Sequence, residues 1–280
     1  MKKLYTYPAK PFVKWVGGKT QLLDDIKKFL PSDLSQRNDV TYIEPFVGGG
    51  AVLFWILQEY PNITKAIIND INEELICTYR VIKSDVENLI LELTRIQTEY
   101  LALDNVERKN YFLFQRNRFN EKNNSDVKTA ALLIFLNRTC FNGLYRVNSK
   151  GKFNVPYGKY TNPKICDEET LRADSAILQR VEVLCGDFAQ TGKYAGDNVL
   201  YYYRNRLQFV YLRKLLFQIG HVLLRAEGAA DGLEEGHRVL HAAVLPDLLL
   251  QPAVDGGELA GADGGLHVQI LLHLQQVLGA

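Results

Sequence analysis

The sequence of 280 residues predicts an α/β fold, a doubly wound sheet interrupted by an inserted domain of helices and one β-hairpin. Three observations predict this arrangement. A short apolar run ends in three consecutive glycines and is followed, about one helix later, by a second apolar run. A long stretch with apolar residues at helical spacing comes next. Strand-like runs resume only near residue 181.

The glycine-rich segment is the most informative part of the chain. It reads YIEPFVGGGA over Tyr42–Ala51, and the returning run reads AIINDIN over Ala66–Asn72. Glycine lets the backbone pass close to a ligand. Asp70 lies 20 residues after Gly50, about the spacing at which an acid ending the second strand binds ribose hydroxyls. The glycines alone could form a purely structural turn, but the order of strand, turn, helix and acid favours a nucleotide-binding sheet.

The preceding segment, Lys10–Pro31, predicts a loop followed by a short helix. The loop carries Trp15 and a two-glycine turn before Lys19, and a lysine at a helix start beside an indole suits an anionic group and a flat ring. Chance placement is the alternative. The turn is not a P-loop, because Val13 stands where that motif has its first glycine. The helix should end at the proline and present one apolar side, formed by Leu22, Leu23, Ile26, Phe29 and Leu30.

The inserted domain is predicted to combine helices with a hairpin. Residues 72–120 have apolar positions mainly three and four apart, among them Leu75, Ile76, Tyr79, Ile82, Leu89, Ile90, Leu93 and Ile96. An apolar helix then leads into alternating residues around Asn148–Gly151, which predict a hairpin turn. Basic and aromatic residues alternate along this hairpin, which suits insertion into a nucleic-acid groove. Further strands are predicted over Val181–Asp187 and Asp197–Tyr203.

Charge is distributed unevenly although the formal net charge is only +1. The stretch from Val127 to Cys166 has no acidic residue and seven basic ones, which are Lys128, Arg138, Arg146, Lys150, Lys152, Lys159 and Lys164. A stretch of one sign suggests contact with phosphates. A solvated basic face is the alternative, although such faces usually carry acids as well.

The remaining composition argues against several other classes of protein. The four cysteines are scattered without CxxC pairs or nearby histidines, so we expect reduced thiols and no metal site. No apolar run approaches the roughly 20 residues of a membrane span, and the first residues lack the apolar core of a signal peptide. We therefore expect a cytoplasmic protein without membrane contact, and a monomer.

The motifs together resemble those of the DNA adenine-N6 methyltransferases of the Dam type. The resemblance runs from about Pro11 to Tyr203 and depends on FVKWVGGK, EPFVGGGAVLF, NDIN and FNGLYRVNSKGKFNVPYGKY in that order. It implies the S-adenosylmethionine-dependent methyltransferase fold, with S-adenosylmethionine as cofactor. By this resemblance Trp15 and Lys19 help to hold the cofactor, and Asp70 takes its ribose hydroxyls. The other implied cofactor-binding residues are Phe46, Gly48 and Gly50 in the turn, with Asp187 and Phe188 beside the adenine ring.

The resemblance also implies duplex DNA as the partner and assigns target recognition to residues 71–165. Arg146 would read a guanine through a bidentate contact in the major groove, worth about 1–3 kcal/mol of discrimination. Phe141, Asn142 and Leu144 would wedge into the duplex, and Pro156 and Lys159 would make further contacts. The implied target is GATC. The target adenine must leave the base stack, which costs a few kcal/mol.

The catalytic domain is expected over 1–70 and 166–203, and it is incomplete. The family's DPPY segment would follow the strand that begins near Asp197, but no two prolines are adjacent anywhere in the chain. No catalytic residue can therefore be assigned.

The composition changes at the same place. All five histidines, but only one of the 18 lysines, lie beyond residue 200. Residues 204–280 thus form a divergent tail, either a small domain or out-of-frame sequence.

Three functions are compatible with these observations. The first is site-specific methylation of adenine N6 in duplex DNA, with activity in doubt because DPPY is absent. The second is a DNA-binding module without turnover. RNA or protein methylation is the third, and the hairpin motif argues against it.

Overall fold

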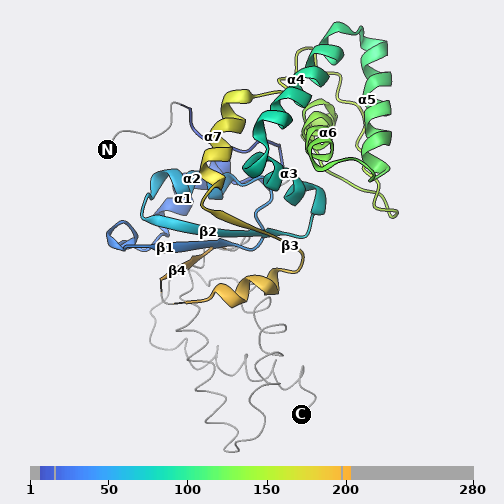
Figure 1. Ribbon diagram of the computed structural model, residues 1–280. Coiled ribbons are helices and arrows are strands. Elements are labelled where there is room, and N and C mark those ends of the chain that lie inside the picture. The colour runs from blue at the N-terminus through green and yellow to red at the C-terminus, as the bar shows by residue number, and fades with distance from the viewer. Residues whose placement is uncertain (1–6, 16, 197, 203–280) are drawn as a thin grey trace, which may run out of the picture.

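The computed structural model describes residues 7–15, 17–196 and 198–202 (Figure 1). The predicted tail, 204–280, and the site of the missing DPPY segment lie outside these residues. Four strands form one sheet, namely β1 (Val40–Glu44), β2 (Ile63–Asp70), β3 (Val181–Cys185) and β4 (Val199–Tyr201). The longer helices are α1 (Leu23–Lys28), α2 (Ala51–Glu59), α3 (Glu73–Ser84), α4 (Val86–Ala102), α5 (Asn105–Asn120), α6 (Asp126–Thr139) and α7 (Glu168–Leu178).

The sheet has the order β3-β2-β1-β4, and every neighbouring pair is parallel. Tyr42 faces Ala66 in β2 on one side and Leu200 in β4 on the other. Because the strands are parallel, their carboxyl ends meet at one edge, where ligands of such sheets bind. The predicted order of strand, glycine turn, helix and strand is confirmed, and so is the α/β fold class.

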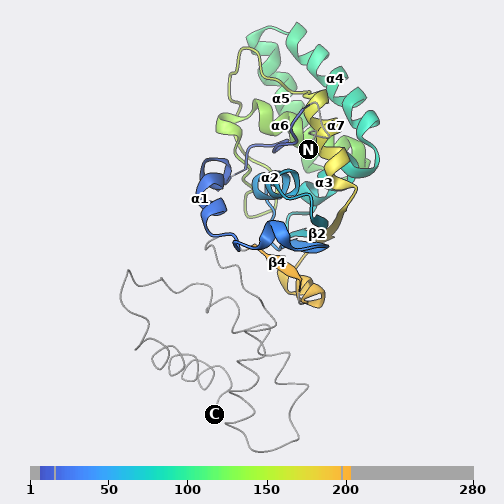
Figure 2. The same ribbon diagram turned by 90° about the vertical axis from the view of Figure 1, so that its left-hand side faces the viewer.

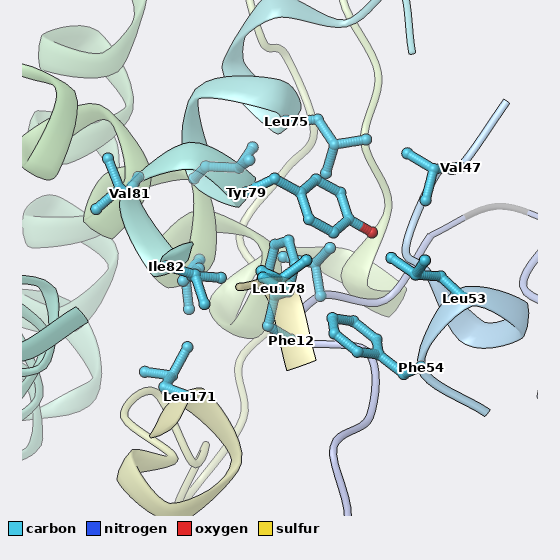
Figure 3. Close-up of a cluster of buried hydrophobic side chains, with 14 of the residues drawn as sticks. Phe12, Val47, Leu53, Phe54, Leu75, Tyr79, Val81, Ile82, Leu171 and Leu178 are labelled. Atoms are coloured by element: carbon cyan, nitrogen blue, oxygen red, sulfur yellow. The ribbon is translucent and has the colours of Figure 1, made fainter. Parts of the chain in front are cut away.

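The main core lies on the sheet face that is covered by α2, α3 and α7 (Figure 1). Tyr42, Ala66 and Ile68 point into it, and their intervening neighbours Ile43 and Ile67 point to the opposite face. Figure 3 shows the centre of this core, where Tyr79 of α3 lies between Phe12 of the N-terminal segment and Phe54 of α2. The core therefore fixes the helix that follows the glycine turn against the N-terminal segment around Phe12.

The opposite face is covered, among the described residues, by the 3₁₀ helix η4 (Phe188–Tyr194). The hydroxyl of Tyr201 donates to the carbonyl oxygen of Thr191 over 2.9 Å. The predicted strand before η4 ends at Cys185 rather than Asp187, because the Asp187 side chain instead accepts a hydrogen bond from the Ala189 amide and begins η4.

Helices α4, α5 and α6 form a lobe on the same side of the sheet as α3 and α7, as both views show (Figures 1 and 2). The eight apolar residues whose spacing predicted helices over 72–120 lie in α3 and α4, and all are buried. Asp104 and Glu107 form a capping box that begins α5. Because α3 packs against β2 and β3 as well as α6, it links the sheet to the lobe, and the domain boundary near residue 71 stays a prediction.

The predicted apolar side of the first helix is only partly correct. Helix α1 ends at Lys28, and the 3₁₀ helix η1 (Thr20–Leu22) precedes it. Ile26 is buried, but Leu22 is 44% exposed and Phe29 is 58% exposed. Leu23 and Leu30 are partly buried against the core, so spacing identified the inward-facing side but not the two residues that stay exposed.

Candidate functional site

The glycine turn after β1 has a strained backbone that only glycine adopts readily. Gly48 has a φ of 50° and Gly50 a φ of 78°. The amide of Gly48 donates to Asp70 Oδ2 over 3.0 Å, and its carbonyl oxygen accepts from the Tyr79 hydroxyl over 2.9 Å. Figure 3 shows this hydroxyl directed away from α3 toward Val47. Both backbone polar groups of Gly48 are therefore held by side chains from the sheet and from α3.

A cavity of about 560 Å³ lies in front of this turn. Small-molecule sites range from roughly 300 to 1,000 Å³. Five predicted residues lie together in its wall, namely Trp15, Lys19, Phe46, Gly48 and Gly50. The indole packs so closely that a Cβ on Gly48 would lie 2.9 Å from Trp15 Cδ1. The turn and the indole therefore form one continuous wall.

The wall also contains three charged residues that the sequence analysis did not assign to the cofactor site, namely Lys14, Glu44 and Arg138. Glu44 is only 3% exposed and accepts a hydrogen bond from the Tyr42 hydroxyl over 2.9 Å. The sequence did contain a signal that could have identified Glu44 as a site residue. It is the last residue of β1, and the carboxyl end of a central strand faces the ligand. Arg138, predicted within the basic stretch, is instead largely buried and donates to the Phe12 carbonyl oxygen.

The predicted hairpin is confirmed by an antiparallel bridge between Val147 and Phe153. The Asn148 amide donates to the Lys152 carbonyl oxygen, and the Gly151 amide closes the turn onto the Asn148 carbonyl oxygen, both over 2.9 Å. Gly151 takes a φ of 69°. The hairpin is held by isolated bridges rather than by continuous strands.

The predicted wedge loop lies beside the end of the hairpin. The Phe141 amide donates to the Pro156 carbonyl oxygen over 2.8 Å, and Cys140 is bridged to Tyr157. Phe141 is 51% exposed, and Asn142 beside it is also exposed with a φ of 54°. A large apolar ring held out in solvent by a strained backbone suits contact with a partner.

Comparison with known proteins identifies the family. The profile described as "D12 class N6 adenine-specific DNA methyltransferase" matches residues 15–203. The chain belongs to this class. A type II methyltransferase of Methanocaldococcus jannaschii is 52% identical over 197 residues, which cover 70% of this chain and 68% of that protein. The DNA adenine methylase of Escherichia coli strain K12 is 33% identical over 194 residues, covering 69% and 63%.

The residues that match the family model, 15–203, are nearly the same as the range of about Pro11 to Tyr203 over which the motifs resemble the family. A third relative, the DNA adenine methylase of Haemophilus influenzae, is 35% identical over 193 residues, covering 69% of this chain and 62% of its own length. The chain thus aligns with about two thirds of each methyltransferase or less. Membership implies a methyl donor and a DNA substrate. Within the described residues, no helix has both the length and the apolar character needed to cross a bilayer.

Not every residue assigned to the methyltransferase cofactor site lines the cavity. In the described part of the chain, Asp70 lies behind the turn, where Oδ2 accepts from Gly48 and Oδ1 accepts from the Asn72 amide over 3.0 Å. The ring of Phe188 contacts that of Phe46 in a tilted arrangement, with centroids 5.3 Å apart and an interplanar angle of 39°, and Asp187 is exposed at the start of η4. Of these three residues only Phe188 has a described contact with a cavity-lining ring, and the cofactor contacts assigned to all three stay a prediction.

The residues that the resemblance assigns to DNA lie in the wedge loop and the hairpin, and they differ in exposure. Arg146 is exposed, and its Nε donates to Asn154 Oδ1 over 2.8 Å, which orients the guanidinium along the hairpin. Lys159 is exposed at a φ of 57°, and Leu144 is partly buried against the core. Pro156 is exposed and accepts the Phe141 amide as described.

Proposed function

We propose that this chain binds S-adenosylmethionine and duplex DNA containing GATC, and that its fold serves methylation of adenine N6. The observation that carries the proposal is the contact between the cavity wall and the loop that is assigned to DNA. The cavity wall that contains Trp15 and the glycine turn adjoins the exposed loop Phe141–Gly143. A cofactor cavity beside a DNA-facing loop is what base modification requires, because the target base must leave the duplex to reach the donor.

The chemistry of the cavity wall fits S-adenosylmethionine. The indole face of Trp15 offers a flat apolar wall, and Lys19 offers a cation at the start of η1. The glycines allow close approach of the ligand. When bound, this cofactor supplies a methyl group on a sulfonium. Asp70 fixes the turn through the Gly48 amide, so we assign it to the ribose hydroxyls through its remaining lone pairs.

The DNA surface fits the sequence-reading role assigned to Arg146. A guanidinium already oriented by Asn154 loses less conformational entropy when it makes two parallel hydrogen bonds to a guanine. Lys150, Lys152 and Lys159 are exposed on the same hairpin region and would neutralise phosphates. Phe141 and Asn142 would fill space near the extruded base.

A specific observation favours a second function, DNA binding without turnover. In the class, the acid and carbonyl that accept the adenine N6 hydrogens follow the strand corresponding to β4. This chain continues after Tyr202 as Tyr203, Arg204, Asn205 and Arg206, with neither acid nor proline. The cofactor and DNA contacts assigned above all precede this point, so binding does not require the missing segment.

Methyl transfer and binding should be measured on the same full-length chain. Tritiated S-adenosylmethionine and a GATC duplex report transfer, and a gel shift of the same duplex reports binding. Specific binding together with transfer supports methylation, and specific binding without transfer supports the second function. A matched variant replaces residues 203–206 with Asp-Pro-Pro-Tyr, and a gain of transfer would show that this segment alone was lacking. No preference for GATC over a scrambled duplex would contradict both functions.

A further inference from the structure

The N-terminal segment 9–15 is held in place by side chains from three helices. The chain has no regular structure here, yet several of its backbone polar groups are hydrogen-bonded to side chains. The side chains that pair with this backbone are those of Gln58, Asn137, Arg138 and Asp174. Gln58, Arg138 and Asp174 attach the segment to α2, α6 and α7, respectively. Asn137 does more, because its amide reaches a second segment.

The side chain of Asn137 connects the cavity wall to the DNA-facing loop. Asn137 lies in α6 and is 2% exposed. Its Oδ1 accepts from the Lys14 amide, and its Nδ2 donates to the carbonyl oxygens of Lys14 and Gly143, each over 2.8 Å. Lys14 precedes Trp15 in the cavity wall, and Gly143 ends the loop Phe141–Gly143. One buried amide therefore fixes both segments at once.

Two further contacts cross the same junction. A Cβ on Gly143 would lie 2.5 Å from Lys14 Cδ, so the lysine chain lies directly on this glycine. The rings of Trp15 and Tyr145 are stacked, with centroids 5.0 Å apart and an interplanar angle of 27°. A displacement of the cavity wall must then move the loop as well, since close-packed interiors transmit small shifts.

We propose that Asn137 is a positioning residue that couples the affinity for the cofactor to the affinity for duplex DNA. This inference rests on the proposed function. A ligand in the cavity orders Lys14 and Trp15, and the Asn137 amide passes that order to Gly143. The duplex then binds to a loop, Phe141–Gly143, that is already ordered and therefore loses less conformational entropy. Each ligand thus raises the affinity for the other.

The test is a binding cycle on the full-length chain. The dissociation constant of S-adenosylhomocysteine is measured with and without a saturating GATC duplex, and the ratio of the two values gives the coupling. We expect a ratio of about fivefold or more for the unmodified chain, as in ordinary coupled sites. Asn137→Ala should bring the ratio close to one, while the nucleoside alone still binds.

A matched control separates coupling from stability. Asn62 also donates its Nδ2 to two backbone carbonyl oxygens, those of Leu34 and Arg37, over 2.7 and 2.9 Å, but far from the junction in sequence and contacts. Asn62→Ala should lower the unfolding temperature without changing the ratio. If Asn137→Ala does not fold, Tyr145→Leu weakens the same junction without removing a buried amide and should also lower the ratio.

The outcomes distinguish this inference from the proposed function. Binding of both ligands to the unmodified chain with a ratio near one overturns the coupling alone. An unchanged ratio in folded Asn137→Ala, or in Tyr145→Leu where the first variant does not fold, overturns the role of the junction. Absence of binding by either ligand overturns the proposed function and the coupling together.

Discussion

Substitution of Gly50 should destabilise the fold through one identifiable contact. A Cβ at this position would lie 2.4 Å from the Tyr79 hydroxyl oxygen and 3.0 Å from Phe54 Cε2. The hydroxyl cannot move away freely, because it donates to the Gly48 carbonyl oxygen over 2.9 Å. Both rings are buried in the core shown in Figure 3. Gly50→Ala must therefore either break this hydrogen bond or shift the turn.

The expected loss in the free energy of unfolding for Gly50→Ala has two parts, one from the backbone and one from packing. A left-handed backbone costs a non-glycine residue roughly 1–2 kcal/mol, offset by about 0.4–1 kcal/mol because alanine restricts the unfolded chain. Overpacking adds about 1–3 kcal/mol. We therefore expect Gly50→Ala to lower the free energy of unfolding by about 1–4.5 kcal/mol.

Gly151→Ala is the matched control, because Gly151 has a φ of 69° and nothing within 4 Å of its would-be Cβ. It should cost about 1 kcal/mol or less, since only the backbone part applies. Urea unfolding followed by tryptophan fluorescence measures both variants. Adding Tyr79→Phe should recover part of the loss in Gly50→Ala, because it removes the oxygen at 2.4 Å. Equal losses for the two glycine variants would refute the reasoning.

Three other predictions concern DNA and pH. Arg146→Ala should reduce the preference for GATC over a duplex with the guanine replaced by about 5- to 150-fold, corresponding to the 1–3 kcal/mol of a bidentate contact, in competition gel shifts. Lys150→Gln should weaken binding to all duplexes alike and reduce the slope of log affinity against log salt by about one. Burial raises the pKa of Asp174 well above that of an exposed carboxyl, so its stabilising contribution is greatest at acidic pH and is lost as the pH rises through the raised pKa. Asp174→Asn should therefore raise the unfolding temperature at neutral pH relative to the unmodified chain and flatten its pH dependence.

Periodicity and glycine chemistry predicted most of the fold. The order of strand, turn, helix and strand around Gly48 and Gly50 was readable because only glycine tolerates such a turn beside a ligand cavity. The helices of the lobe were readable because their apolar residues recur every three or four positions and are buried as expected.

Long-range contacts could not be predicted in the same way. Asn137 is one polar residue in an apolar helix, and only the folded chain brings Lys14 and Gly143 to its two ends. Arg138 counts as a basic residue in any charge profile, yet it is largely buried against the Phe12 carbonyl group. Sequence patterns report local spacing and net charge, and they contain no information about which distant backbone a side chain meets.

The position of β4 shows where the proposed binding residues end and the missing catalytic segment would begin. β4 is an outer strand of the described sheet, and the Tyr202 amide still donates to the Ile43 carbonyl oxygen over 2.9 Å. The chain is therefore aligned with β1 up to the point beside Glu44, at the edge where the cavity opens. The contacts described above for Trp15, the glycine turn and the hairpin are made by residues that precede this point. Under the proposed function, a changed sequence after Tyr202 removes the groups that would act on the adenine but leaves the residues assigned to the cofactor and to DNA in place.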